Sequence, residues 1–370
     1  MNISILPARV RILSFPIHSR PLWTHAIVKN TFFPSRRDSF FSYTENLSEI
    51  SIIADVRSIE KDFLQSPALK STPNIKICDD IFRVLEIDNA YGLELNSKRI
   101  NDLTGPLARA GISIFYLSTY QTDYFLIKEK RIPFAIKTLQ ACGFDFIDLD
   151  AVELTTPPES PSPIEIPAGN FNLEQPPTSL KSVENLGNGD TLEHDIIVQV
   201  RRQCAKIVTK HKLRLVGLDK EYRDNWAMKL IRILLYPELD EDFRSSKSRF
   251  VSFTATEDGI SLIVEESVLA QFEHYMINMS LTRRPMRLIQ IDLSIFVCDR
   301  YGIVHSMSSP LSDAGINLIY LSTTQCANVL VEEDHLPIAQ QILEALDTPP
   351  VTPATDQEMT RFRFESHLVA

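Results

Sequence analysis

The chain has 370 residues, and its 48 acidic side chains outnumber its 38 basic ones, so the formal charge is 38 − 48 = −10. This balance excludes binding of nucleic acid or anionic lipid by bulk charge, because such binding needs an excess of Lys and Arg. With 44% apolar and 23% charged residues, the chain can bury real cores, which excludes disorder of the whole chain.

The first 37 residues carry basic but no acidic side chains, a composition typical of a transit peptide. The same stretch contains four prolines, and its apolar residues form a strand-like run at 10–15 and a helix-like run at 22–32. A folded first module is therefore expected in preference to a cleaved presequence.

Apolar periodicity in the first half predicts two modules of strands and helices. The first is expected to contain a strand, a helix and a strand hairpin, at 8–15, 21–33, 39–45 and 50–55. The second is expected to contain a strand at 82–88, a helix that ends at Gly111, strands at 112–118 and 124–128, and a helix at 132–139. Glycine favours the left-handed conformation that follows a helix C-terminus, which places the helix end at Gly111.

A segment rich in proline, residues 151–195, separates the two halves. It contains seven of the 22 prolines among many polar residues and predicts a disordered tether. A basic helix is expected next, at about 195–211. Its charge is typical of a solvated helix face, and a docking surface is the alternative.

The second half repeats the order of elements. Expected elements of a third module lie at 213–219, 222–236, 249–256 and 260–265. Those of a fourth are a strand at 288–293, a helix at 303–314 closed by Gly315, strands at 316–322 and 328–332, and a helix at 336–346. The residues from 348 onward predict a disordered tail.

An internal repeat explains this order. Residues 105–135 align without a gap on 309–339, with fourteen identities in 31 positions at a constant offset of 204. A weaker pair, 40–53 and 250–263, has an offset of 210. The near-equal offsets indicate that a half of two modules is duplicated, which predicts an α+β fold of four β-α-β-β-α-β modules, as in ferredoxin-like domains.

Common catalytic and metal-binding motifs are absent from the sequence. The five cysteines lie far apart without a CxxC pair, and no HExxH, GxSxG, GxxxxGK[ST] or GxGxxG pattern occurs. Neither an enzyme, a bound metal nor a cofactor is expected, and no apolar run is long enough to cross a bilayer. Widely spaced cysteines indicate reduced thiols and an intracellular location.

Several motifs resemble the CASTOR family of cytosolic amino-acid sensors. They are LSTYQTD at 117–123 with its copy at 321–327, RVRIL at 9–13, FFSYTE at 40–45, and YGIV at 301–304 before a helix that contains PL. The resemblance implies four tandem ACT domains, a cytoplasmic location, and an amino acid held where the second and fourth modules meet. It also implies action through GATOR2, the regulator upstream of TOR complex one.

The resemblance also implies the site residues. Ser113 and Ile114 are expected to face the ligand carboxylate, and a loop is expected to wrap the opposite side. That loop comprises Val297, Cys298, Asp299, Arg300, Tyr301, Gly302 and Ile303. Thr323, Thr324 and Ala327 are expected to line the pocket for the ligand side chain.

Two of these positions differ from the pattern of relatives that bind arginine. Arg300 follows Asp299 where an acidic pair is expected, and Ala327 replaces an aspartate. Because a buried guanidinium needs a carboxylate, a neutral or acidic amino acid, or no ligand, is expected instead of arginine. Arg300 either pairs with a ligand carboxylate or is a surface arginine.

Two other functions remain open, a scaffold of ACT domains without a ligand and a regulatory subunit of a biosynthetic enzyme. Edge strands of such sheets pair between chains, so a homodimer is also expected. The expected divisions are modules at 1–75 and 76–150, a tether at 151–195, the basic helix with the third module at 196–283, the fourth module at 284–347 and a tail at 348–370.

Overall fold

The computed structural model describes residues 1–36, 38–87, 96–147, 204–239, 249–280, 284–295 and 301–345. The predicted tether and tail lie outside these ranges. So does most of the predicted basic helix.

A β-α-β-β order of elements occurs four times. Segment 1 (residues 2–77) contains β1 (Asn2–Phe15), α1 (Arg20–Phe32), β2 (Phe41–Glu45), β3 (Ile50–Asp55), α2 (Val56–Ser58), a π-helix (Ile59–Leu64), α3 (Ala68–Ser71) and β4 (Lys76–Ile77). Segment 2 (residues 82–147) contains β5 (Phe82–Ile87), α4 (Asn96–Arg109), β6 (Ile114–Ser118), β7 (Asp123–Lys128), α5 (Ile132–Ala141) and β8 (Asp145–Ile147).

The second half has the same plan. Segment 3 (residues 206–278) contains β9 (Lys206–Val208), β10 (Leu213–Leu218), α7 (Arg223–Leu235), β11 (Val251–Ala255), β12 (Ile260–Glu265), α9 (Glu266–Leu269) and β13 (Ile277–Asn278). Segment 4 (residues 286–345) contains β14 (Met286–Asp292), α10 (Ile303–Asp313), β15 (Leu318–Ser322), β16 (Cys326–Glu332) and α11 (Leu336–Ala345). The expected α+β class is confirmed, while the division into four modules at the predicted boundaries stays a prediction.

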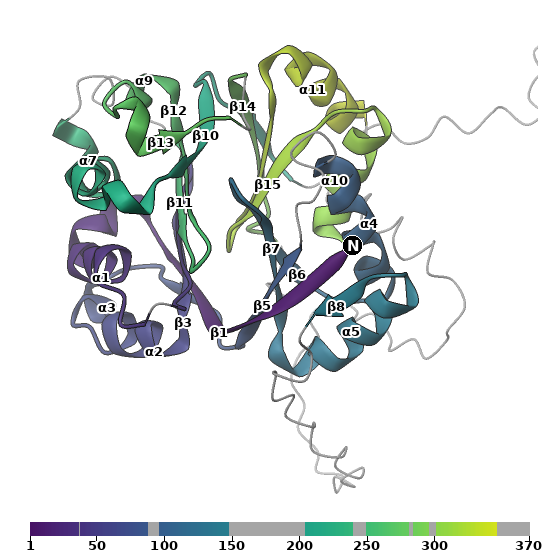
Figure 1. Cartoon of the computed structure of the whole chain (residues 1–370), viewed down its shortest axis with the longest axis horizontal. Helices are drawn as coiled ribbons and strands as arrows, with labels where there is room; N and C mark the ends of the chain where they lie inside the picture. Colours follow the sequence, from purple (N-terminus) through teal and green to yellow (C-terminus); the bar gives the residue numbers. More distant parts are fainter. Residues whose placement is uncertain are drawn as a thin grey trace, which may run out of the picture.

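All the strands in the described parts of the chain join one sheet, in which segments from different halves are neighbours. β2 of segment 1 pairs antiparallel with β11 of segment 3, and β6 of segment 2 pairs with β15 of segment 4. A further pairing between β10 and β14, at Leu213 and Met286, brings the two ends of the strand order together. The sheet thus curls back on itself, and the halves depend on each other for strand partners (Figure 1).

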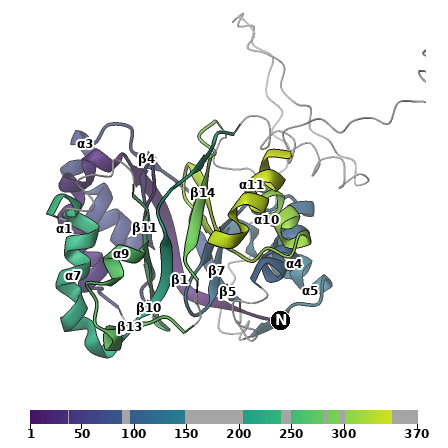
Figure 2. The same ribbon diagram turned by 90° about the horizontal axis from the view of Figure 1, so that it is seen from above.

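Helices cover the outer faces of this sheet in two groups (Figure 2). Those of segments 1 and 3 lie on one side and those of segments 2 and 4 on the other. Each group covers its own apolar cluster, around Trp23 and Trp226 in the first case and Leu103 and Met307 in the second. A third cluster, which includes Leu117, Leu126, Leu215 and Leu330, lies on the inner face of the strands. Burial of three clusters by one curled sheet gives most of the stabilisation.

Helix ends occur where glycine predicts them. Gly111 follows α4 with φ of 63° and Gly315 follows α10 with φ of 70°, both in the left-handed region. The N–H of Ile112 then returns to the carbonyl of Leu107, as the N–H of Ile316 does to that of Leu311. These paired terminations confirm that α4 and α10 are repeat-related helices.

The prediction of a helix over 195–211 is wrong where the structure describes it. Residues 206–208 form β9, and Ile207 and Val208 lie opposite Gln290 and Ile289 of β14. The free edge of β14 offers backbone hydrogen bonds to this short β-branched stretch, and a helix could not use them. None of the described helices is long and apolar enough to cross a membrane.

Candidate functional site

The two halves of the repeat meet at β6 and β15. The Ser322 hydroxyl accepts the backbone N–H of Tyr116 at 3.0 Å, and the Ser118 hydroxyl accepts that of Tyr320 at 3.2 Å. The rings of Tyr116 and Tyr320 meet edge to face, with centroids 6.4 Å apart. Because 118 and 322 differ by the repeat offset of 204, this contact has approximate two-fold symmetry.

Helices α4 and α10 pack beside this strand contact. Gly105 of α4 permits their close approach, since a Cβ there would lie 3.2 Å from the His305 ring. Thr104 Oγ1 lies 3.4 Å from His305 Nδ1, and Ser308 Oγ donates to Asn101 Oδ1 at 3.0 Å. Small and polar side chains thus hold the two helices together.

A small cavity of about 10 Å³ lies where the N-terminal end of α10 approaches α4 and β6. Its lining comprises Thr104, Ala108, Ile112, Ile114, Gly302, Ile303, Val304 and His305. That volume suits about one water molecule. An amino acid would need the α10 end and α4 to move apart.

The chemical character of this cavity is apolar with two polar groups. Five of its lining residues are aliphatic, while Thr104 and His305 provide a hydroxyl and an imidazole. No carboxylate occurs among the described residues of the lining. The cavity therefore favours an uncharged side chain over a guanidinium.

The two related segments differ in charge close to this cavity. In segment 2, buried Arg99 forms an ion pair with buried Asp123. Adding the repeat offset leads to Ile303 and Ala327 in segment 4, which share an apolar cluster. The ion pair of segment 2 is thus replaced by two apolar side chains in segment 4. Ala327 in place of an aspartate is therefore matched by Ile303 in place of an arginine.

The structure brings together three of the predicted site residues, Ile114, Gly302 and Ile303. Gly302 precedes α10 with φ of 81°, and its carbonyl accepts the N–H of Ser306 at 2.8 Å. Ser113 lies half-buried directly before Ile114, and Tyr301 lies near Gly111. The predicted residues Val297, Cys298, Asp299 and Arg300 lie outside the described residues.

The other predicted residues do not line this cavity. Ala327 is fully buried in the helix-covered core, opposite Ile291 of β14 and Ser322 of β15. Thr323 lies in the turn between β15 and β16, where its hydroxyl donates to the Cys326 carbonyl at 3.2 Å. Thr324 follows in the same turn, half-buried.

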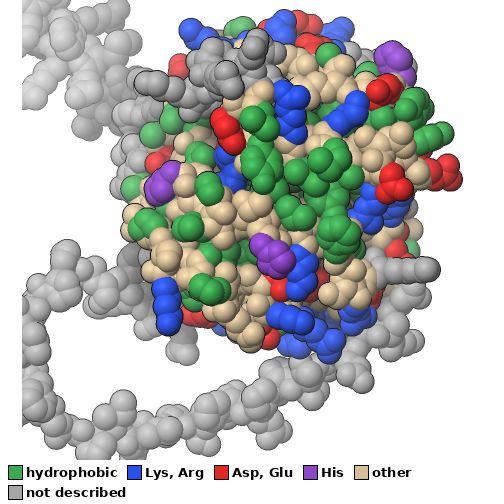
Figure 3. Space-filling view, turned by 90° about the vertical axis from the view of Figure 1, so that its left-hand side faces the viewer, with side chains coloured by type: hydrophobic (Ala, Val, Ile, Leu, Met, Phe, Trp, Pro, Cys, Tyr) green, Lys and Arg blue, Asp and Glu red, His purple; other side chains and the backbone are tan. Residues whose placement is uncertain are grey.

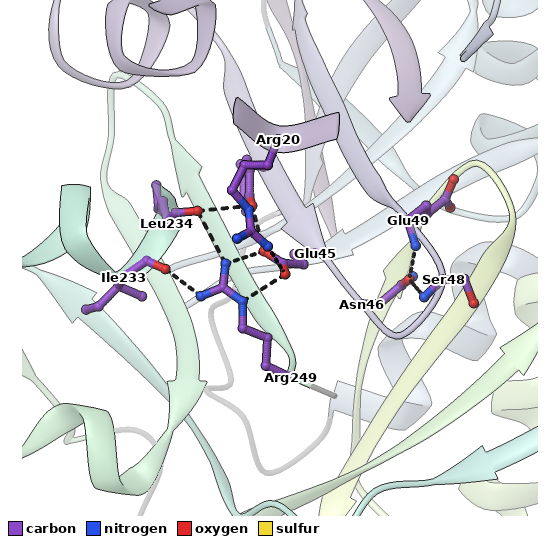
Figure 4. A network of polar contacts seen from close by, with 9 residues as sticks. Arg20, Glu45, Asn46, Ser48, Glu49, Ile233, Leu234 and Arg249 are labelled. Atoms are coloured by element: carbon purple, nitrogen blue, oxygen red, sulfur yellow. Dashed lines mark hydrogen bonds and ion pairs between the residues drawn. The ribbon is translucent and has the colours of Figure 1, made fainter. Parts of the chain in front are cut away.

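Thr323 instead contacts the β2–β3 turn of segment 1. Asn46 Nδ2 donates to Thr323 Oγ1 at 3.2 Å, and the Gln325 N–H donates to Glu49 Oε1 at 2.7 Å. On the adjacent strand, Gln290 accepts the Leu47 N–H at 3.0 Å. Figure 4 shows this turn beside the strands of segment 4. The tip of segment 1 is therefore fixed in segment 4, at the positions predicted to hold a ligand side chain.

The β11–β12 turn of segment 3 makes the corresponding contact with segment 2. Tyr124 Oη lies 3.0 Å from Thr256 Oγ1, and the Tyr120 N–H donates to Ser261 Oγ at 2.7 Å. A Cβ at Gly259 would lie 1.6 Å from the Gln121 side chain, so glycine makes room there. Each half thus inserts a turn into the other half.

Sequence reasoning missed the α4 side of the cavity. Thr104 and Ala108 are four residues apart on a helix and share a face, and His305 is the repeat counterpart of Asn101. The repeat and the helical period together give the signal that these residues face the partner segment. The family motifs alone do not indicate that Thr104, Ala108 and His305 face the partner segment.

Two further observations concern metal binding and the buried cysteine of the described residues. No group of three His, Cys, Asp or Glu side chains among them could hold a metal ion. Burial raises the pKa of the Cys326 thiol to about 12, and Gln290 Nε2 donates to its sulfur at 3.3 Å. Such a thiol is not a nucleophile at neutral pH.

Comparison with known proteins agrees with the repeat. The ACT domain family matches residues 77–141 and 281–345, which cover most of segment 2 and all of segment 4. The "Cytosolic arginine sensor for mTORC1 subunit 1" of Homo sapiens is 26% identical over 93% of this chain and 98% of its own length. The corresponding protein of Pongo abelii has the same identity and coverage.

A third relative, "Putative protein CASTOR3P" of Homo sapiens, is 33% identical over 31% of this chain and 71% of its own length. Among solved structures, aspartate kinase from Synechocystis aligns with a TM-score of 0.32 at 12% identity, over 95% of this chain and 57% of the kinase chain. That score is too low to support an argument.

Proposed function

This chain belongs to the CASTOR family of ACT-domain proteins, and from that premise we propose that it is a non-enzymatic amino-acid sensor. It would act by ligand-dependent binding to a partner complex in TOR signalling. The relatives from Homo sapiens and Pongo abelii that align over 93% of this chain are called cytosolic arginine sensors, which supports a cytoplasmic sensor here. We further propose four tandem ACT modules, with the predicted boundaries.

The cavity between segments 2 and 4 is the main observation in support. It joins Ile114 to Gly302 and Ile303, and these residues come from two segments that each match the ACT domain. The first backbone N–H groups of α10, which begins at Ile303, would receive the ligand carboxylate, as helix N-termini do. The remaining predicted residues, Ser113, the loop at 297–300, Thr323, Thr324 and Ala327, are proposed to complete the site.

The proposed ligand is a neutral amino acid rather than arginine. Ile303 gives the cavity an apolar wall at the position where segment 2 has Arg99, and the described lining holds no carboxylate, so a guanidinium would lack a partner there. Thr104 and His305 could accept or donate single hydrogen bonds to a small polar side chain. A small aliphatic or hydroxyl amino acid fits this lining best.

The mechanism follows from the size of the cavity. A ligand that enters must separate the α10 end from α4, and the exchanged turns join segment 4 to segment 1 and segment 2 to segment 3, so the separation would reach all four segments. Ligand and partner are then linked, because each would bind one arrangement better than the other. A complex of the GATOR2 type is the proposed partner.

Homodimerisation is proposed through the outer face of segments 1 and 3. Exposed apolar side chains lie on or directly after α1 and α7, namely Leu22, Phe33, Met228, Tyr236 and Leu239. Figure 3 shows apolar side chains gathered across this face, with Lys and Arg around them. The double variant Phe33→Glu with Met228→Glu should lower the molar mass measured by light scattering from that of a dimer to that of a monomer. Phe134→Glu on α5 is the control and should leave the mass unchanged.

Thermal unfolding with each of the twenty amino acids tests the sensor proposal. One neutral amino acid should raise the Tm of the wild type, and Ser113→Trp should abolish that shift by filling the site. Asn317→Trp, at the repeat-related position, is the matched control and should retain it. A flat response across all twenty amino acids at millimolar concentration would contradict ligand sensing.

A scaffold without a ligand, or a regulatory subunit of a biosynthetic enzyme, is the second candidate. The small volume of the cavity favours it. In that case affinity purification would recover the same partner with and without amino acids. Recovery of a metabolic enzyme would identify the regulatory-subunit form.

A further inference from the structure

A second and larger pocket lies within segment 1, away from the cavity described above. Its volume is about 600 Å³, which is within the range of small-molecule sites. Its walls are β1 near Pro7 and Arg9, the end of α1 at Lys29, the connection from Pro34 to Phe41, and the stretch from Asp55 to Asp62. One continuous part of the chain therefore builds it.

Most charged groups in this lining are already paired. Arg36 Nε donates to Asp38 at 2.8 Å, Lys29 forms an ion pair with Asp62, and Arg9 forms one with Glu129. Arg57 and Lys61 differ, because both are exposed and neither forms an ion pair with a described residue. Two cations are thus available at the mouth of the pocket.

Asp55 is the third group without a side-chain partner among the described residues. It is half-buried at the end of β3, in the same lining as Arg57 and Lys61. Burial raises its pKa to about 6. The backbone N–H of Phe40 and the charge of Arg36 act against this rise, and the charge of Asp38 adds to it. At pH 7.5 it is therefore mostly ionised and can accept hydrogen bonds.

The backbone around these groups is unusual. After the single turn of α2, residues Ile59–Leu64 form a π-helix, which buries Ile59 and Phe63 and turns Lys61 outward. π-helical turns are rare and are frequently found at functional sites. The irregularity places a cation at a pocket rather than on a uniform helix face.

We propose that this pocket binds a small organic anion of about the size of a sugar phosphate, with its anionic group at Arg57 and Lys61 and an ammonium group at Asp55. A phosphate suits this part of the lining, because two exposed cations four residues apart in the chain match a dianion. Apolar surface from Ala8, Phe40 and Phe41 would contact the body of the ligand. The site is independent of the proposed amino-acid cavity, with which it shares no lining residue.

Calorimetric titration of the full chain at pH 7.5 with three related probes tests this proposal. Glucosamine 6-phosphate has both ends, glucose 6-phosphate lacks the ammonium, and glucosamine lacks the phosphate. Glucosamine 6-phosphate should bind with a Kd below about 1 mM, glucose 6-phosphate about tenfold more weakly, and glucosamine not measurably. Binding of glucosamine as tight as that of its phosphate would overturn the proposal.

Variants assign the two ends of the ligand. Arg57→Glu with Lys61→Glu should weaken glucosamine 6-phosphate about 30-fold or more, and Lys137→Glu on α5 is the matched control with no expected effect. Asp55→Asn should weaken glucosamine 6-phosphate but leave glucose 6-phosphate nearly unchanged. All four positions are exposed or half-buried, so a single cooperative unfolding transition in each variant would show that the fold persists. No binding of either phosphate at about 10 mM, or equal binding to the double variant, would refute the site.

Discussion

Asn46 Nδ2 lies 3.2 Å from Thr323 Oγ1, so a turn in the first segment is joined to a turn in the last. Asn46 also stabilises its own turn, because its Oδ1 accepts the N–H groups of Ser48 and Glu49 at 2.9 and 3.0 Å. One fully buried side chain thus serves both the turn and the contact between halves.

Replacement of Asn46 by Ala should lower the free energy of unfolding by about 2 kcal/mol, because buried donors and acceptors lose their partners. Asn46→Asp is the matched variant, since it keeps the acceptor for the turn but loses the donor to Thr323. Because it also buries a carboxylate, it should destabilise the fold in urea titrations by at least as much as the Ala variant. Equal stability of wild type and Ala variant would mean that this contact does not join the halves.

The buried ion-pair network beside this turn gives the second prediction. Glu45 forms ion pairs with Arg20 of segment 1 and with Arg249, which lies just before β11 (Figure 4). The hydroxyl of Tyr43 also donates to Glu45, at 2.7 Å. Glu45→Gln should destabilise the fold by about 3 to 5 kcal/mol, because it leaves two buried cations without a carboxylate.

The control for Glu45 is the exposed pair of Arg36 and Asp38. Asp38→Asn should change stability by less than about 1 kcal/mol, as surface ion pairs usually do. Chemical unfolding of both variants measures the contrast. Similar small effects would show that Glu45 is solvated in solution.

Repeat periodicity and glycine positions made most of the fold predictable. The end of α4 at Gly111 and of α10 at Gly315 are local signals that the repeat shows twice, and the strands that follow are apolar runs. The closure of the sheet through Leu213 and Met286 could not be predicted in this way. Pairing between strands from different halves depends on tertiary packing, which no local pattern encodes.

The candidate site was predictable only in part, for a similar reason. The family motif identifies Ile114, Gly302 and Ile303, which the structure brings together. It also suggests Thr323, whose hydroxyl is instead joined to Asn46 from another segment. A motif gives the position of a residue in its own segment, whereas the partner in this case comes from 277 residues away.

The serine pair between β6 and β15 gives the third prediction. Ser118→Ala and Ser322→Ala each leave one buried backbone N–H without its acceptor, at Tyr320 and at Tyr116. Each should cost about 1 to 2 kcal/mol, and the two costs should be similar because the contact is nearly symmetric. Thermal and urea unfolding would measure this, and a large difference between the two would show that the symmetry is only geometric.

Asp55 gives a prediction about pH. Its pKa is about 6 in the folded chain and near 3.8 when unfolded, so above pH 6 the fold holds an ionised carboxyl that burial disfavours. As the pH falls from 6 to 4, the folded state binds a proton that the unfolded state does not, and the penalty disappears. Asp55→Asn should therefore stabilise the protein by about 1 kcal/mol at pH 7.5, allowing for partial exposure, and by almost nothing at pH 4.

Asp38 supplies the opposite sign in the same pocket. The hydrogen bond from Arg36 lowers the pKa of its carboxyl, so the ionised form is favoured by folding. Asp38→Asn should lose a small stabilisation at pH 7.5 and none at low pH. If Asp55→Asn and Asp38→Asn shift the pH profile in the same direction, the burial of Asp55 is not the cause of its raised pKa.

The last prediction concerns the exchange of an ion pair for an apolar pair between the two copies of the repeat. Ala327→Asp would bury a carboxylate without a partner and should destabilise segment 4 by about 3 kcal/mol or more. Addition of Ile303→Arg recreates the pair that Arg99 and Asp123 form in segment 2, and should restore about 2 kcal/mol. Urea unfolding of the single and double variants gives the coupling energy.

The reverse exchange in segment 2 completes the test of that pairing. Asp123→Ala alone leaves buried Arg99 without its carboxylate, whereas Arg99→Ile with Asp123→Ala reproduces the apolar pair of segment 4. The double variant should therefore be more stable than Asp123→Ala, since an apolar pair removes the desolvation of two charges. Strictly additive effects in both segments would mean that the two positions do not interact. Loss of this ion pair would then not explain why the proposed ligand site is apolar.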